Sequence, residues 1–127
     1  MSYRIVTNNP KVKDSYEDIV FVNGGFEDVL LKTRNLVHSG YELINHPLGA
    51  SIRMFYSPYR SIIIAQKEEK INHIYVETIE NSIENYRKNM EVRKPDIENK
   101  EDYSLIDFEL LISALGEHKR NQELGSN

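Results

Sequence analysis

The sequence predicts a small single domain of the α/β class, Rossmann-like, with a mostly parallel sheet of about four strands covered by helices and two C-terminal helices. Strand-like and helix-like segments alternate over the first seventy residues, as they do in βαβ units. Segment 61–66 is continuously apolar, which is typical of a central parallel strand. At 127 residues, 39% of them hydrophobic, the chain can bury one core.

The first forty residues contain two pairs of a strand followed by a helix. A strand is expected over 3–7, and the Asn-Pro pair after it is typical of a helix start, so a short helix is expected over 10–16. A second apolar strand is expected over 18–22. Apolar residues at helical spacing predict a helix over 26–38, which Gly40 ends.

The middle of the chain contains two more strands and a long loop between them. A strand over 41–44 leads into the loop, in which 52–56 is expected to be partly extended. The strand over 61–66 follows. Apolar residues then recur at helical spacing from 71 to 91, although the β-branched residues at its start are also compatible with a strand.

The last helix is expected over 103–115, where apolar residues cover much of the circumference, and Gly116 ends or kinks it. Such a helix is buried on more than one side, either within the fold or against a second copy, so 103–115 is a candidate homodimer interface. The expected domain therefore spans 1–116. Residues 117–127 are expected to form a polar, disordered tail.

Composition excludes several classes of function. The net charge of −4 argues against a nucleic-acid binder, and no apolar run is long enough for a membrane span. The absence of cysteine excludes disulfides and thiol chemistry and fits a cytoplasmic protein. The four histidines have no metal-ligand spacing, and no G-x-G-x-x-G motif is present. We therefore expect no metal and no cofactor.

One stretch suggests a binding site. Although the chain has 20 acidic residues, none lies between Leu43 and Lys67, so an anion could sit there. The carboxyl ends of parallel strands meet at one edge of a sheet. Three polar motifs each follow a predicted strand: Asn8-Asn9-Pro10, Asn23-Gly24-Gly25 and Asn45-His46-Pro47. These motifs and the acid-free stretch supply the expected ligand-binding residues: Asn8, Asn9, His46, Ser51, Tyr59, Arg60 and Ser61.

Arg60 and His46 each allow two interpretations. Arg60, just before a buried strand, can bind a carboxylate or phosphate with two donors, or it can form a structural salt bridge or carbonyl clamp. His46 is the one candidate for acid–base catalysis, but no acid lies near it in the sequence. A structural histidine is the alternative.

The ordered set of motifs resembles the GrdX family over about residues 3–115. The similar segments are Thr7-Asn8-Asn9-Pro10, His46-Pro47-Leu48 with Ser51, Pro58-Tyr59-Arg60-Ser61, Ile79–Glu84 and Asp107–Leu110. Proteins of this family are encoded beside the glycine, sarcosine and betaine reductases of amino-acid-fermenting anaerobes. The resemblance implies a cytoplasmic protein linked to amino-acid reduction, with reductase components as expected partners. It implies no catalytic mechanism.

Three functional hypotheses follow. The first is a non-catalytic accessory protein that binds a small anion, or an anionic loop of a partner, at the strand ends. The second is a small enzyme with His46 as acid–base, which requires a perturbed pKa and a neighbouring carboxylate in a pocket. The third is a protein–protein adaptor that dimerises through 103–115.

Overall fold

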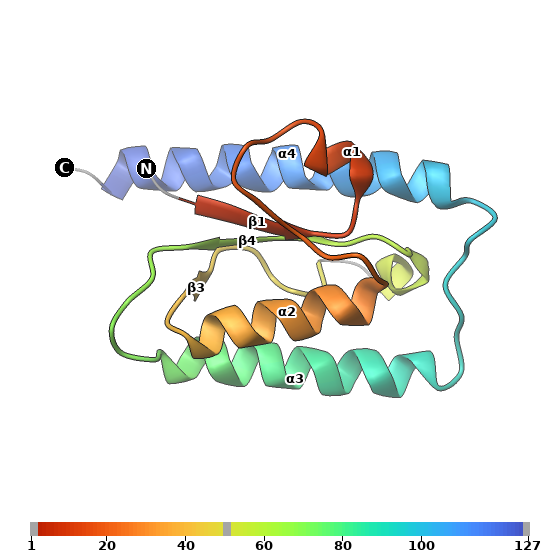
Figure 1. The fold of residues 1–127 in the computed structure, drawn as a ribbon, viewed down its shortest axis with the longest axis horizontal. Helices are drawn as coiled ribbons and strands as arrows, with labels where there is room; N and C mark the ends of the chain where they lie inside the picture. Colours follow the sequence, from red (N-terminus) through yellow and green to blue (C-terminus); the bar gives the residue numbers. More distant parts are fainter. Residues whose placement is uncertain (1–2, 50–51, 126–127) are drawn as a thin grey trace.

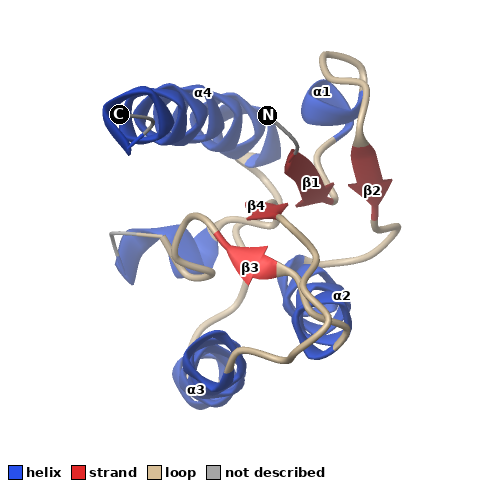
Figure 2. Ribbon diagram, turned by 90° about the vertical axis from the view of Figure 1, so that its left-hand side faces the viewer, coloured by secondary structure: helices blue, strands red, loops and turns tan. Residues whose placement is uncertain are grey.

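The fold is an α/β domain in which helices cover both faces of a four-stranded sheet (Figures 1 and 2). The computed structural model of the chain describes residues 3–49 and 52–125. In chain order, the elements are β1 (Tyr3–Thr7), α1 (Pro10–Lys13), β2 (Ile19–Phe21), α2 (Phe26–His38), β3 (Glu42–Leu43), the 3₁₀-helix η1 (Ile52–Tyr56), β4 (Ser61–Ala65), α3 (His73–Met90) and α4 (Lys100–Gly125).

The expectation of a mostly parallel, Rossmann-like sheet is wrong, because the sheet is mixed. Its strand order is β2-β1-β4-β3, and in the described part of the chain only β1 and β2 pair in parallel. β4 is antiparallel to β1 and to β3. A parallel neighbour needs a crossover connection, usually a helix, but the chain between β3 and β4 contains only a 3₁₀ turn and therefore returns antiparallel.

The apolar segment that suggested a central parallel strand is indeed central. All five residues of β4 are buried, because helices cover both of its faces. Ile62 and Ile64 face the cluster formed with α2 and α3, whereas Ile63 faces Leu111 of α4. Burial on both faces explains the continuous apolar pattern, and this pattern carries no information about strand direction.

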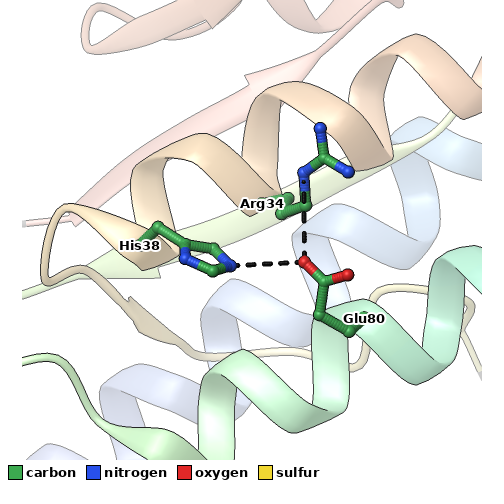
Figure 3. Close-up of polar contacts among 3 residues, drawn as sticks. All are labelled: Arg34, His38 and Glu80. Carbon is green, nitrogen blue, oxygen red and sulfur yellow. Dashed lines mark hydrogen bonds and ion pairs between the residues drawn. The ribbon is translucent and has the colours of Figure 1, made fainter.

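Helices α2 and α3 lie on the same side of the sheet and pack against each other (Figure 1). The rings of Phe26 and Tyr86 stack with their centroids 4.6 Å apart. On the surface, Glu80 Oε1 lies 3.2 Å from His38 Nε2 and 3.9 Å from Arg34 Nε (Figure 3). These exposed polar contacts stabilise the fold little, so the apolar contacts hold the two helices together.

Helix α4 covers the other face, beside α1 (Figure 2). It begins three residues before the expected start of 103 and continues through Gly116, where the sequence predicted an end or a kink, to Gly125. The segment 52–56, expected to be partly extended, forms η1 instead. Residues 74–76 lie in α3, whose first turn is capped by the Asn72 side chain. The domain bounds 1–116 stay a prediction.

In the described ranges, 3–49 and 52–125, none of the helices combines the length and the hydropathy needed to cross a membrane.

Candidate functional site

The three polar motifs meet at one end of the sheet. β1, β2 and β3 run in the same direction, so all three end at the edge where β4 begins. Asn8, directly after β1, joins their loops. Its Nδ2 donates to the carbonyl oxygens of Gly24 at 2.9 Å and Pro58 at 2.8 Å. Its Oδ1 accepts a hydrogen bond from the Arg60 backbone N–H at 2.9 Å.

Arg60 is a buried clamp on the loop after β3. Its Nε donates to the Pro47 carbonyl oxygen at 2.8 Å, and an NH2 hydrogen bond reaches the His46 carbonyl oxygen at 2.6 Å. The residue is only 3% exposed. Burial lowers the pKa of Arg60, and the charge of Asp107 acts in the opposite direction. Among the described residues, no carboxylate forms an ion pair with this guanidinium.

Behind Arg60, a buried polar network connects the strand ends to α4. Asn9 caps α1 by accepting from the Lys11 N–H, and its Nδ2 donates to Asp107 Oδ2 at 3.0 Å. The Ser61 hydroxyl donates to the same Oδ2 at 2.7 Å. Because that proton is committed, the Thr7 hydroxyl, 2.7 Å away, donates to Ser61 Oγ. The network fixes the register between β1, β4 and α4.

Asp107 is the most unusual member of this network. The residue is 0% exposed, and its Oδ1 has no hydrogen-bond partner in the described part of the chain. Burial raises the pKa of its carboxyl, while the hydrogen bonds from Asn9 and Ser61 and the charge of Arg60 hold the pKa down. The sequence analysis placed Asp107 in a segment similar to the GrdX family but did not count it among the site residues. Its position four residues before the apolar Leu111 puts an acid on the buried face of a helix and could have indicated its role.

His46 lies on the surface side of the Arg60 clamp. Its ring Nδ1 accepts a hydrogen bond from the Leu48 N–H at 3.1 Å. A neutral imidazole that accepts at Nδ1 carries its proton at Nε2, so Nε2–H is a donor. Partial burial lowers the pKa of His46, and the positive charge of Arg60 lowers it further. The neutral, donating ring is therefore the favoured form near pH 7.

A pocket of about 350 Å³ lies between the exit of β3 and the second half of α4. One wall comes from residues 43–46 and the other from Ala114, Glu117, His118 and Asn121. His118 is 9% exposed, and its Nε2 is buried without a hydrogen-bond partner among the described residues. The sequence analysis had assigned this part of α4 to the tail. The helical spacing of Leu111 and His118 places them on one face and could have indicated the pocket wall.

The remaining residues that were expected at the site lie in different environments. Tyr59 is half-buried, and its backbone N–H and carbonyl both bond to the Ser57 hydroxyl. Asn9 and Ser61 are buried in the Asp107 network. Ser51 lies outside the described residues. In the described ranges, no group of three His, Asp or Glu side chains is arranged to hold a metal ion.

Comparisons with known proteins identify one family. The sequence model of a family described as GrdX-like protein matches residues 4–116, most of the chain. Comparisons with curated proteins and with solved structures return no match. The matched segment contains Asn8, His46, Arg60 and Asp107, but it stops before Glu117 and His118.

Proposed function

This chain belongs to the GrdX-like protein family, and from that premise we propose that it is a non-catalytic accessory protein that binds a small anionic ligand, or an anionic loop of a partner, at the strand ends. Membership implies a connection with glycine reductase. Links to sarcosine and betaine reductases, contact with reductase components and a cytoplasmic location remain predictions. The ligand would bind beside His46, on the accessible side of the Arg60 clamp.

The observation that carries the proposal is the position of the buried Arg60 guanidinium next to His46. An NH2 hydrogen bond joins it to the His46 carbonyl oxygen at 2.6 Å, and among the described residues no carboxylate forms an ion pair with it. This positive charge attracts an anion. The Nε2–H of the neutral ring would donate a hydrogen bond to it, and the loop from Leu43 to Lys67 contains no acid to oppose it. Arg60 would act through its charge, because two of its donors already bind carbonyl oxygens.

The acid–base hypothesis for His46 has two supporting observations and one opposing it. The lowered pKa and the presence of Glu117 in the same pocket support it. However, a general base needs a free lone pair facing the substrate. The Nδ1 lone pair of His46 already accepts from Leu48, and Nε2 then carries a proton. This geometry favours binding over proton abstraction.

The proposal predicts that an anion stabilises the protein through His46. Phosphate, acetyl phosphate and nucleotides are screened by thermal shift, and a ligand at a hundred times its dissociation constant should add about 2.7 kcal/mol. His46→Leu removes the Nε2–H donor and should abolish the shift. His73→Leu, at an exposed position at the start of α3, is the matched control and should retain it. A shift that His46→Leu leaves unchanged, or no shift with any anion, would contradict the proposal.

A homodimer through 103–115 also remains a prediction. Four apolar side chains of α4 in this range are between 40% and 48% exposed: Leu105, Ile106, Leu110 and Ile112. Burial of these side chains against a second copy would remove them from water. Sedimentation equilibrium should then give twice the monomer mass of 14.9 kDa, and Leu110→Asp should reduce it to the monomer mass. A monomer mass for the unmodified chain across the micromolar range would contradict the dimer.

A further inference from the structure

The pocket between β3 and α4 contains charged and polar groups of more than one kind. His46 stands on the β3 side, and Glu117, His118 and Asn121 stand on the α4 side. Leu43, Ile44 and Ala114 supply apolar wall. The volume of about 350 Å³ lies in the range of small-molecule sites, and the largely polar lining suits a polar ligand.

His118 gives an independent indication of a ligand. Its Nε2 is buried and, within the described residues, has no hydrogen-bond partner. A buried polar atom without a partner is unfavourable, so such atoms call for a specific explanation. A ligand atom in the pocket would supply the missing partner after a small shift of side chains at the wall.

Glu117 determines which ligand fits. A simple anion that accepts from His46 Nε2–H would also face the carboxylate of Glu117 in the same pocket, and like charges repel. A ligand that carries a cationic nitrogen beside its carboxylate turns that repulsion into attraction. The side-chain amide of Asn45 does not compete, because it bonds to Ile63 N–H and to the Ser61 carbonyl oxygen.

We infer that this pocket binds a small zwitterion of the amino-acid type, with its carboxylate on the His46 and His118 ring nitrogens and its cationic nitrogen on Glu117. The inference rests on the proposed function, since both use the His46 donor. It specifies the anionic ligand as a carboxylate with an adjacent ammonium group. The apolar wall at Ile44 and Ala114 would contact an aliphatic part of the ligand.

Three matched compounds test the inference by isothermal titration on the full chain. Alanine carries both charges, propionate lacks the ammonium group and ethylamine lacks the carboxylate. We expect alanine to bind at least about tenfold more tightly than either of the others. Glu117→Gln should reduce alanine binding to the level of propionate. Glu109→Gln, an exposed position of α4 outside the pocket, is the control and should change nothing.

NMR of the histidine rings provides a second measurement that does not depend on a buried substitution. Alanine should shift the Nε2 resonances of both His46 and His118, and His73 should not respond. Propionate binding as tight as that of alanine, or alanine binding that is unchanged in Glu117→Gln, would overturn the inference and leave the proposed anion site standing. Loss of every response, including the anion shift that depends on His46, would overturn both.

Discussion

Arg60→Ala is expected to lower the free energy of unfolding by about 4 kcal/mol, the largest effect of any single substitution that we predict. The substitution removes two charge-assisted hydrogen bonds, to the carbonyl oxygens of His46 and Pro47, and leaves space where a side chain that is 97% buried had been. Hydrogen bonds that involve a charged group contribute about 1.5 to 3 kcal/mol each. Urea denaturation measured with the linear extrapolation method gives this value directly.

Two further variants are compared with Arg60→Ala: Arg60→Lys keeps the positive charge at this position, and Arg34→Ala is an exposed control. Arg60→Lys keeps the charge but lacks the fork that reaches two carbonyl oxygens, so we expect a loss of about 2 kcal/mol. Arg34→Ala removes an exposed arginine whose contact with Glu80 is 3.9 Å, and its effect should stay within about 0.5 kcal/mol. If Arg60→Ala is as stable as the unmodified chain, Arg60 is not a structural clamp. The result would then favour the hypothesis that Arg60 binds an anionic ligand directly.

The choice of Arg60 shows what the sequence can reveal about this site. Its position before an apolar strand, in a stretch without acids, identified it as a constrained cation. Both alternatives, a ligand anion and a carbonyl clamp, were open at that stage. The partners turned out to be backbone carbonyl oxygens, which every residue possesses. No residue type therefore indicates them, and only the path of the loop brings them within reach.

The limits of the fold prediction have a similar physical origin. Local patterns identified β1 and α2, because the spacing of apolar residues and the capping residues lie within or next to each segment. The direction of β4 depends on how the loop from β3 returns, and burial on both faces looks the same in either direction. The longer α4 depends on packing, because His118 is buried beyond Gly116, the residue whose type predicted an end or a kink.

Asp107→Ala is the second large effect, a loss of about 3 kcal/mol at pH 7. The change deprives two buried donors, Asn9 Nδ2 and Ser61 Oγ, of their shared acceptor. It also removes the carboxylate whose charge acts on Arg60. Because Asn9 caps α1 and bonds to α4, the loss should loosen both helices, and amide hydrogen exchange should rise first around Ser104. Glu109→Ala, on the exposed side of the same helix, should change the stability by less than about 0.5 kcal/mol.

Asp107→Asn measures how ionisation of the carboxyl affects stability, because the amide keeps an acceptor oxygen but cannot ionise. Burial raises the pKa of Asp107 in the folded state, so between the unfolded and the folded pKa the folded chain binds more protons than the unfolded chain. The contribution of this carboxyl to stability is therefore fully present below about pH 4 and is lost as the pH rises through the raised pKa. The stability advantage of the unmodified chain over Asp107→Asn should accordingly shrink from pH 4 to pH 7. An advantage that grows with pH would mean that Arg60 and the two donors stabilise the carboxylate more than burial penalises it. In that case the strand-end network would contain a true buried ion pair.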